Sequence, residues 1–145
     1  MKKKILYGAL LGIVVLLSIY FYFAWQKQPD TASVKADFTV EAPLFLKEFD
    51  SDILAANTKY NNKMVEVTGT VSSTETADTT VNIKMADSAT GSFIIFAFQE
   101  QHVPEAKILS PGMTATIRGS FSAGIKSELL GTTKIDFKRS TLIKH

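Results

Sequence analysis

The chain lacks cysteine altogether and has only two histidines and one tryptophan among its 145 residues. The absence of cysteine excludes a disulfide framework, a thiolate metal site, a cysteine nucleophile and a cysteine-linked lipid. His102 and His145 share no metal-ligand spacing, so we expect no metal ion and no cofactor. A G-x-S-x-G nucleophile elbow and a phosphate-binding glycine loop are also missing. We therefore expect a protein that is not an enzyme.

The formal net charge of the whole chain is +2, but most of the chain has no excess of basic residues. Four of the lysines lie at the extreme N-terminus or at position 27. Residues 30–145 carry 12 basic and 14 acidic side chains, a formal net charge of −2. This balance does not favour binding to a nucleic-acid polyanion.

One long apolar run is present, from Ile5 to Trp25, with 21 consecutive uncharged positions. As a helix with a rise of about 1.5 Å per residue, it spans about 30 Å, the thickness of a bilayer core. Lys2, Lys3 and Lys4 precede it, and the positive-inside rule then puts the N-terminus in the cytoplasm. We expect a basic tail over 1–4, a transmembrane signal anchor over 5–25 and an exported remainder.

A cleaved signal peptide is the alternative for this segment, with a barrel secreted after cleavage. The run is longer than a usual signal core, and its end, Phe21–Trp25, lacks the small-x-small pattern that signal peptidase requires. We therefore favour an uncleaved anchor.

The exported part divides into a polar linker over 26–38 and a domain over 39–145. A helical apolar spacing predicts one or two amphipathic helices over 41–60, after a cap at Thr39. Alternating apolar residues then predict five strands, over 64–71, 81–85, 92–98, 113–121 and from 135 onward. Polar loops are expected over 72–80 and 122–132, and a short helix from Pro104. The order is typical of a mainly β, five-stranded OB-type barrel with an N-terminal helix and a helix between strands three and four.

Two segments carry a resemblance to a known family. Residues 54–71, LAANTKYNNKMVEVTGTV, and residues 109–119, LSPGMTATIRG, resemble the bacterial tRNA-anticodon-binding-like domains. The resemblance covers roughly residues 40–143. It implies an OB fold behind a signal sequence or membrane anchor, in a bacterial inner membrane, and no catalytic residue. Fold alone does not fix function, so the family name is not evidence of tRNA binding.

The candidate binding residues are those a nucleic-acid-binding barrel needs, namely basic and aromatic side chains. They are Lys84, Phe96, Arg118 and Lys126, with Phe93 and Phe98 beside them in sequence. Because the strand predicted over 92–98 is apolar on both of its faces, we expect the phenylalanines to fill the interior. We expect the basic residues to be solvated, since carboxylates are interspersed with them.

These observations favour a membrane-anchored, exported, non-catalytic binding or assembly module. The expected contacts are the membrane, through residues 5–25, and an envelope protein, peptide or glycan at loops 72–80 and 122–132, placed at one barrel mouth. The first of these loops is acidic, which suits a cationic or neutral partner. The alternative is a domain that binds single-stranded, tRNA-like nucleic acid.

Overall fold

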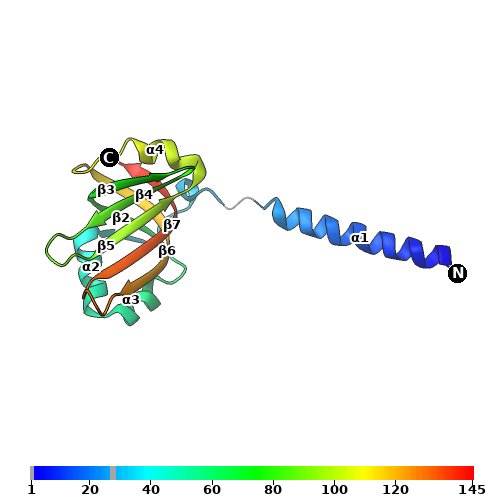
Figure 1. The fold of residues 1–145 in the computed structure, drawn as a ribbon, viewed down its shortest axis with the longest axis horizontal. Coiled ribbons are helices and arrows are strands. Elements are labelled where there is room, and N and C mark those ends of the chain that lie inside the picture. Colours follow the sequence, from blue (N-terminus) through cyan, green and yellow to red (C-terminus); the bar gives the residue numbers. More distant parts are fainter. Residues whose placement is uncertain (1, 27–28) are drawn as a thin grey trace.

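The N-terminal helix α1 (Lys2–Ala24) stands apart from the rest of the chain (Figure 1). The computed structural model describes residues 2–26 and 29–145. Within these ranges one helix is long and apolar enough to cross a membrane, with a mean hydropathy of 2.0 over Tyr7–Ala24. Side chains 7–26 are all exposed, and the buried core begins only after residue 30. Met1 of the predicted tail and Lys27 and Gln28 of the predicted linker lie outside the described residues.

The remainder is built on one sheet of seven strands (Figure 1). The strands are β1 (Phe38–Glu41), β2 (Met64–Thr70), β3 (Ser73–Ala77), β4 (Thr80–Ala86), β5 (Phe93–Phe98), β6 (Thr114–Lys126) and β7 (Thr133–Lys144). Their order is β1-β2-β6-β7-β5-β4-β3. The pairs β1/β2 and β5/β7 are parallel, and the other neighbours are antiparallel.

The predicted five-stranded barrel, closed or nearly closed, is instead an open sheet of seven strands. Segment 38–41, expected as linker and helix start, pairs with β2 as β1, with Phe38 opposite Val65. Residues 73–77, expected as a polar loop, form β3 and pair only with β4. Both strands are edges of an open sheet, and edge strands need no apolar alternation on a buried face.

The open sheet is nevertheless curled. β2 and β3 lie far apart in the strand order, yet only Val71 and Ser72 separate them in the chain. The Val71 amide donates to the Met113 carbonyl at 2.8 Å, and the Ser72 amide donates to the Lys84 carbonyl at 2.7 Å. This short link therefore holds β2, next to one edge of the sheet, close to β3 and β4 at the other edge.

Two helices precede β2, as expected, and they are α2 (Ala42–Ser51) and α3 (Ile53–Tyr60). The chain breaks at Asp52, whose carboxylate accepts the Ala55 amide at 3.0 Å and so caps α3. Thr39, expected as the helix cap, lies instead in β1. The predicted helix from Pro104 is α4 (Val103–Lys107), which follows the 3-10 turn η2 (Glu100–His102).

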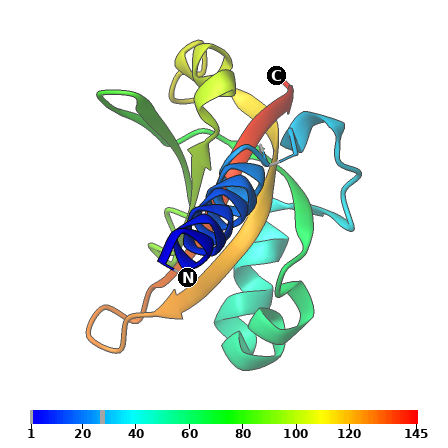
Figure 2. The same cartoon turned by 90° about the vertical axis from the view of Figure 1, so that its right-hand side faces the viewer.

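The helices close opposite ends of the curled sheet. Figures 1 and 2 show α2 and α3 at the bottom and α4 at the top. The turn between β3 and β4 lies at the α4 end, and the turn between β6 and β7 lies at the α3 end (Figure 2). The two loops expected at one mouth are therefore separated. The second is also shorter than expected, because β6 continues to Lys126.

The core lies between the inner sheet face and α2. Its centre is a set of aromatic rings 4.9 to 6.1 Å apart, formed by Phe45, Phe49, Tyr60, Phe96, Phe121 and Phe137. Gly124 of β6 makes room for it, since a Cβ there would lie 2.4 Å from a Phe49 ring carbon. The Asn57 side chain bonds both the amide and the carbonyl of Gly124, at 2.8 and 2.9 Å, and so fixes α3 against β6.

Candidate functional site

The face of β4, β5 and β7 that points away from the core carries the first candidate site, which we call the outer sheet face. Its side chains alternate with the buried ones, and register pairs Lys84 with Ile95 and Ile95 with Asp136. Phe93 lies opposite Lys134 in the next row. All five are half-buried. Because the corresponding strands bind ligands in OB folds, this face is the first place to look for a site.

Lys84 and Phe93 are the two candidate residues that the structure brings together. The Lys84 ammonium lies 4.1 Å from the centre of the Phe93 ring, which is a cation–π contact. Proteins that bind single strands use aromatic rings to stack on bases and cations to contact the phosphates. Here the lysine itself lies over the ring and occupies the place of a base. Nearby, Lys134 is paired with Asp136 at 3.1 Å.

Phe96 lies in the core, on the opposite face of the same strand. Its side chain has no exposed surface and stacks on Phe137 with ring centres 5.0 Å apart. Phe98 is also buried, at 6% exposure. Alternation along β5 thus leaves Phe93 as the phenylalanine of this strand that reaches the outer sheet face.

Arg118 of β6 is occupied by the protein itself. Its guanidinium donates to Glu66 Oε2 from Nη2 at 3.0 Å and from Nε at 3.2 Å. Nη1 donates to the carbonyls of Val34 at 2.8 Å and Ala32 at 3.2 Å. Arg118 therefore holds the segment that follows α1 against the sheet.

Lys126 lies at the far end of the same strand and is exposed. β5 and β7 separate β6 from β4 in the sheet, so Lys126 and Arg118 do not join Lys84 on adjacent strands. The four candidates thus occupy four different environments. Together they make no continuous basic strip.

A second attachment of the segment after α1 involves His102, for which the sequence indicated no partner. The His102 side chain is 10% exposed, with Nε2 2.6 Å from Asp30 Oδ1 and Nδ1 3.1 Å from Glu105 Oε1. Both neighbours are carboxylate oxygens, which only accept, so the doubly protonated ring satisfies both. Burial lowers the pKa of His102, but the hydrogen bonds and charges of the two carboxylates outweigh it and raise the pKa overall.

The same segment contains the short turn η1 (Thr31–Ser33). Asp30 caps it by accepting the Ala32 amide at 2.9 Å, and the buried Thr31 donates its amide to the Gln99 side chain at 3.2 Å. The hydrogen bonds to His102 and Ala32 lower the pKa of Asp30. Residues 30–34 are thus part of the domain surface.

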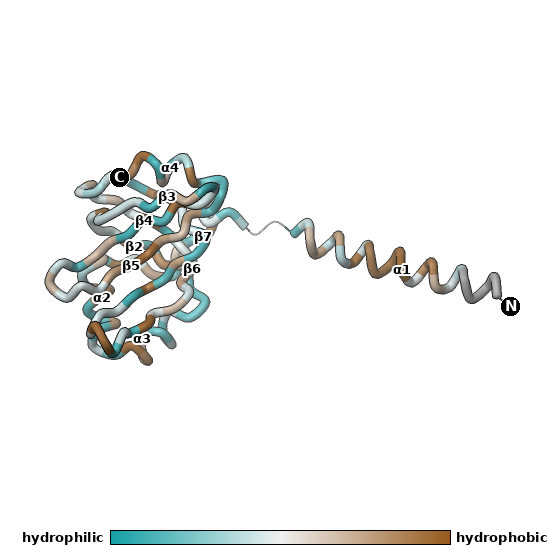
Figure 3. The backbone as a smooth tube through the Cα atoms, viewed as in Figure 1, coloured by the Kyte–Doolittle hydropathy of each residue, from teal (hydrophilic) through white to brown (hydrophobic). Residues whose placement is uncertain are grey.

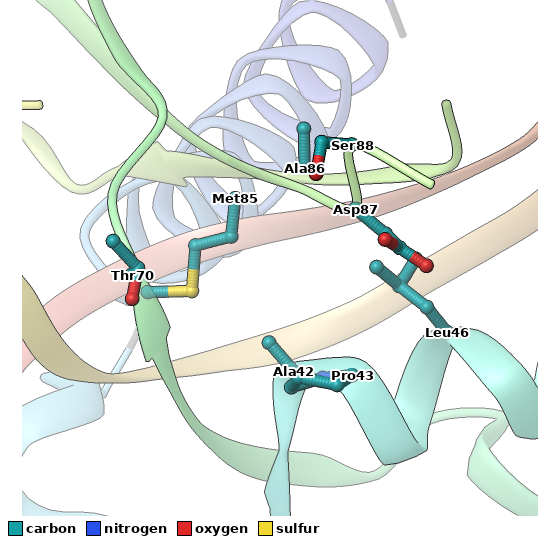
Figure 4. Close-up of a pocket in the computed structure, with 8 residues that line it drawn as sticks. All are labelled: Ala42, Pro43, Leu46, Thr70, Met85, Ala86, Asp87 and Ser88. Atoms are coloured by element: carbon teal, nitrogen blue, oxygen red, sulfur yellow. The ribbon is translucent and has the colours of Figure 1, made fainter. Parts of the chain in front are cut away.

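A hollow of about 220 Å³ lies between α2 and β4 (Figure 4). It is lined by Ala42, Pro43, Leu46, Thr70, Met85, Ala86, Asp87 and Ser88. Its carboxylate, Asp87, already accepts the Ala89 amide at 2.9 Å and the Thr90 hydroxyl at 3.1 Å. The hollow is small, and its lining suits at most a small neutral group. Over residues 2–26 and 29–145, no cluster of three or more potential metal ligands converges.

Sequence reasoning also missed an apolar surface at the turn between β6 and β7. Leu129 is 97% exposed and Leu130 is 76% exposed. The signal was the pair of leucines itself, placed in a segment that otherwise reads as a polar loop.

Several solved structures are similar to parts of this chain. A candidate nucleic acid-binding lipoprotein from Klebsiella pneumoniae subsp. pneumoniae matches with a TM-score of 0.57 and 20% identity, over 82% of this chain and 100% of that one. An OBody bound to hen egg-white lysozyme matches with a TM-score of 0.46 and 14% identity, over 66% and 92% of the two chains. The Entamoeba histolytica asparaginyl-tRNA synthetase matches with a TM-score of 0.41 and 17% identity, over 59% of this chain and 21% of the synthetase.

No curated protein matches the chain. The first of these structures supports an OB-like fold for the domain, at an identity that says nothing of its ligand. The tRNA_anti-like family matches residues 1–130, which is most of the chain. The protein therefore belongs to the tRNA_anti-like family.

Proposed function

We propose that this protein is a membrane-anchored, extracytoplasmic and non-catalytic binding or assembly module. In this proposal α1 spans the inner membrane of a bacterium with its N-terminus in the cytoplasm, and the domain presents the outer sheet face to an envelope protein, peptide or glycan. The observation that carries it is the use of Arg118. Its guanidinium binds Glu66 and two carbonyls of residues 30–34, so it ties the domain to the segment after α1 rather than facing a phosphate.

The anchor and the domain are close together in the chain. Only five residues separate Trp25 from Thr31, and the six Cα–Cα steps between them reach about 20 Å when fully extended. The domain is thus held beside the bilayer surface. A net charge of −2 over residues 30–145 makes a phosphate polymer a poor general partner for it.

Binding of single-stranded nucleic acid is the second candidate function. It is favoured by the contact of Lys84 with Phe93 on the outer sheet face, the face that OB folds use for oligonucleotides. The Klebsiella lipoprotein of similar fold is also named as a candidate nucleic acid-binding protein. In this alternative Lys84 swings off the ring and a base takes its place.

Fluorescence anisotropy with single-stranded RNA and DNA separates the two candidates. Residues 29–145 are suitable because the described side chains of α1, from residue 7 onward, are exposed and lie outside the core. The proposal expects no saturable binding even at low salt. Tight binding that weakens steeply with salt, and that is lost in Lys84→Ala and Phe93→Ala, would establish the alternative instead, because phosphate contacts release counterions. Lys126→Ala is the matched control, an exposed lysine away from this face.

Photo-crosslinking in intact cells tests the partner class. A photoreactive residue at position 84 of the full chain is expected to give a discrete adduct with an envelope component. The same residue at the exposed Thr58, on α3, is the control. Identical adducts from both positions, or none from position 84, would contradict a site on the outer sheet face.

A further inference from the structure

Four exposed apolar side chains gather at the α3 end of the domain, and we call this surface the apolar tip. Ile125, Leu129 and Leu130 lie at the end of the β6–β7 hairpin, and Leu54 lies on α3. Their exposed fractions are 57, 97, 76 and 78%. The two bonds between Asn57 and Gly124 bring α3 and β6 together here, one helical turn after Leu54 and one residue before Ile125. Figure 3 shows hydrophobic segments at this end of the domain, as well as along α1 and the central strands.

The leucines are not needed to form the turn that carries them. The Ser127 amide donates to the Thr132 carbonyl at 2.8 Å, and the Gly131 amide donates to the Ser127 carbonyl at 2.8 Å. The Leu130 amide donates to the Ser127 hydroxyl at 3.3 Å, and Gly131 supplies the positive φ of 65°. Backbone and serine thus close the turn by themselves, and polar residues at 129 and 130 serve equally well. The leucine side chains face outward, toward something other than this fold.

We propose that the apolar tip inserts into the outer leaflet of the bilayer that holds α1, as a second contact of the domain with the membrane. This inference rests on the proposed function, since it needs α1 to be an anchor. The occupant is a lipid surface because the chain itself brings the domain to one: residues 30–34 are bound to the domain, and the chain from Trp25 to Thr31 reaches only about 20 Å.

The dimensions of the domain match this arrangement. The segment after α1 is bound at Arg118, and Lys126 lies eight residues further along β6, about 26 Å at the rise of a strand. A tether of about 20 Å keeps the Arg118 end of β6 near the bilayer, and a strand of this length lets its other end reach the same surface. In the proposed arrangement the β6–β7 hairpin lies along the membrane surface, with the tether at one end and the apolar tip at the other.

Two exposed charged residues, Lys126 and Glu128, adjoin the apolar tip, and the first of them suits the same surface. Lys126 is exposed and follows Ile125 directly. A lysine stem packs along apolar groups while its ammonium reaches the phosphates of the headgroups. This arrangement gives the exposed Lys126 a role that nucleic-acid binding did not.

The test uses the absence of cysteine, which allows one dye to be placed at one chosen position of the full chain. Leu129→Cys carries an environment-sensitive dye, and Thr79→Cys, on the exposed turn at the other end of the domain, is the matched control. Both are reconstituted in vesicles of phosphatidylethanolamine and phosphatidylglycerol, with and without lipids bearing a nitroxide at carbon 5. That depth corresponds to the ~5–10 Å that interfacial side chains reach.

At position 129 we expect blue-shifted emission and about a twofold loss of intensity with the nitroxide lipid, whereas position 79 changes little. Leu130→Ser and Leu54→Ser, added to the labelled chain, are expected to reduce this quenching. Both residues are more than three-quarters exposed, so far-ultraviolet circular dichroism is expected to show an unchanged fold.

The outcomes separate this inference from the proposed function. A chain that fails to float with the vesicles overturns the anchor and the inference together. A chain that floats but keeps its dye at position 129 in water overturns the inference alone. A dye that is shielded without being quenched, and whose emission depends on the protein-to-lipid ratio, indicates a second copy on the tip and also overturns the inference.

Discussion

Replacing Arg118 with methionine tests whether this residue is structural. Methionine keeps the apolar stem but removes every donor to Glu66 and to the carbonyls of residues 32 and 34. The Arg118 and Glu66 side chains are 16 and 18% exposed. Breaking a fully buried pair costs about 3–5 kcal/mol, and a hydrogen bond to a charged group contributes about 1.5–3 kcal/mol. Since water reaches part of Glu66 after the change, we expect a loss of about 2 kcal/mol in the free energy of unfolding.

The assay is urea unfolding of residues 29–145 followed by circular dichroism, because the one tryptophan, Trp25, lies outside the domain. A loss of this size lowers the melting temperature by about 8 °C in a domain of this length. Hydrogen exchange is expected to accelerate at the Ser33 and Val34 amides, which close η1. Lys126→Met is the control, with an expected change within about 0.5 kcal/mol. Wild-type unfolding with intact protection of η1 would refute the structural role of Arg118.

Three further changes test other parts of the fold. Gly124→Ala forces a Cβ against the packed Phe49 ring, so the free energy of unfolding, measured by thermal unfolding, should fall by about 1–3 kcal/mol. Adding Phe49→Leu should partly restore it, and additive losses from the two changes would contradict this contact. His102→Gln should lower the urea midpoint most below pH 6.5, and the difference should shrink as the pH rises through the raised pKa of the folded state; a difference independent of pH would count against the charged ring. Asp52→Ala removes the cap of α3 and should cost about 1 kcal/mol in thermal unfolding, and an unchanged midpoint would exclude that role.

Strands with one buried face were predictable because burial imposes a period of two. Val65 and Val67 in β2, and Val81, Ile83 and Met85 in β4, are buried at every second position. β3 escaped this reasoning because it is an edge strand whose residues 73–77 are half-buried or exposed on both faces. β1 has only four residues and depends on pairing with a segment more than twenty positions away.

The candidate site was harder to predict, because its determinants are tertiary. Arg118 reads as a solvated cation in sequence, but its carbonyl partners lie more than eighty positions earlier in the chain. Phe96 and Phe93 differ in role only through alternation along β5, which the apolar composition of residues 93–98 conceals. His102 gave no local signal of its partner Asp30.

The link at Val71 and Ser72 also determines where the chain tolerates change. Ser72 is exposed, polar and in a connection, the features of a site that usually accepts inserted residues. Yet its hydroxyl accepts the Ala86 amide at 2.8 Å, and the Val71 carbonyl accepts the Gly112 amide at 2.8 Å. These two residues join β2 to β3 and keep the sheet curled. Inserting residues here would let the sheet open and expose the core to water. A tag or fused domain is better placed in the exposed turn between β3 and β4, where extra residues lengthen only a hairpin.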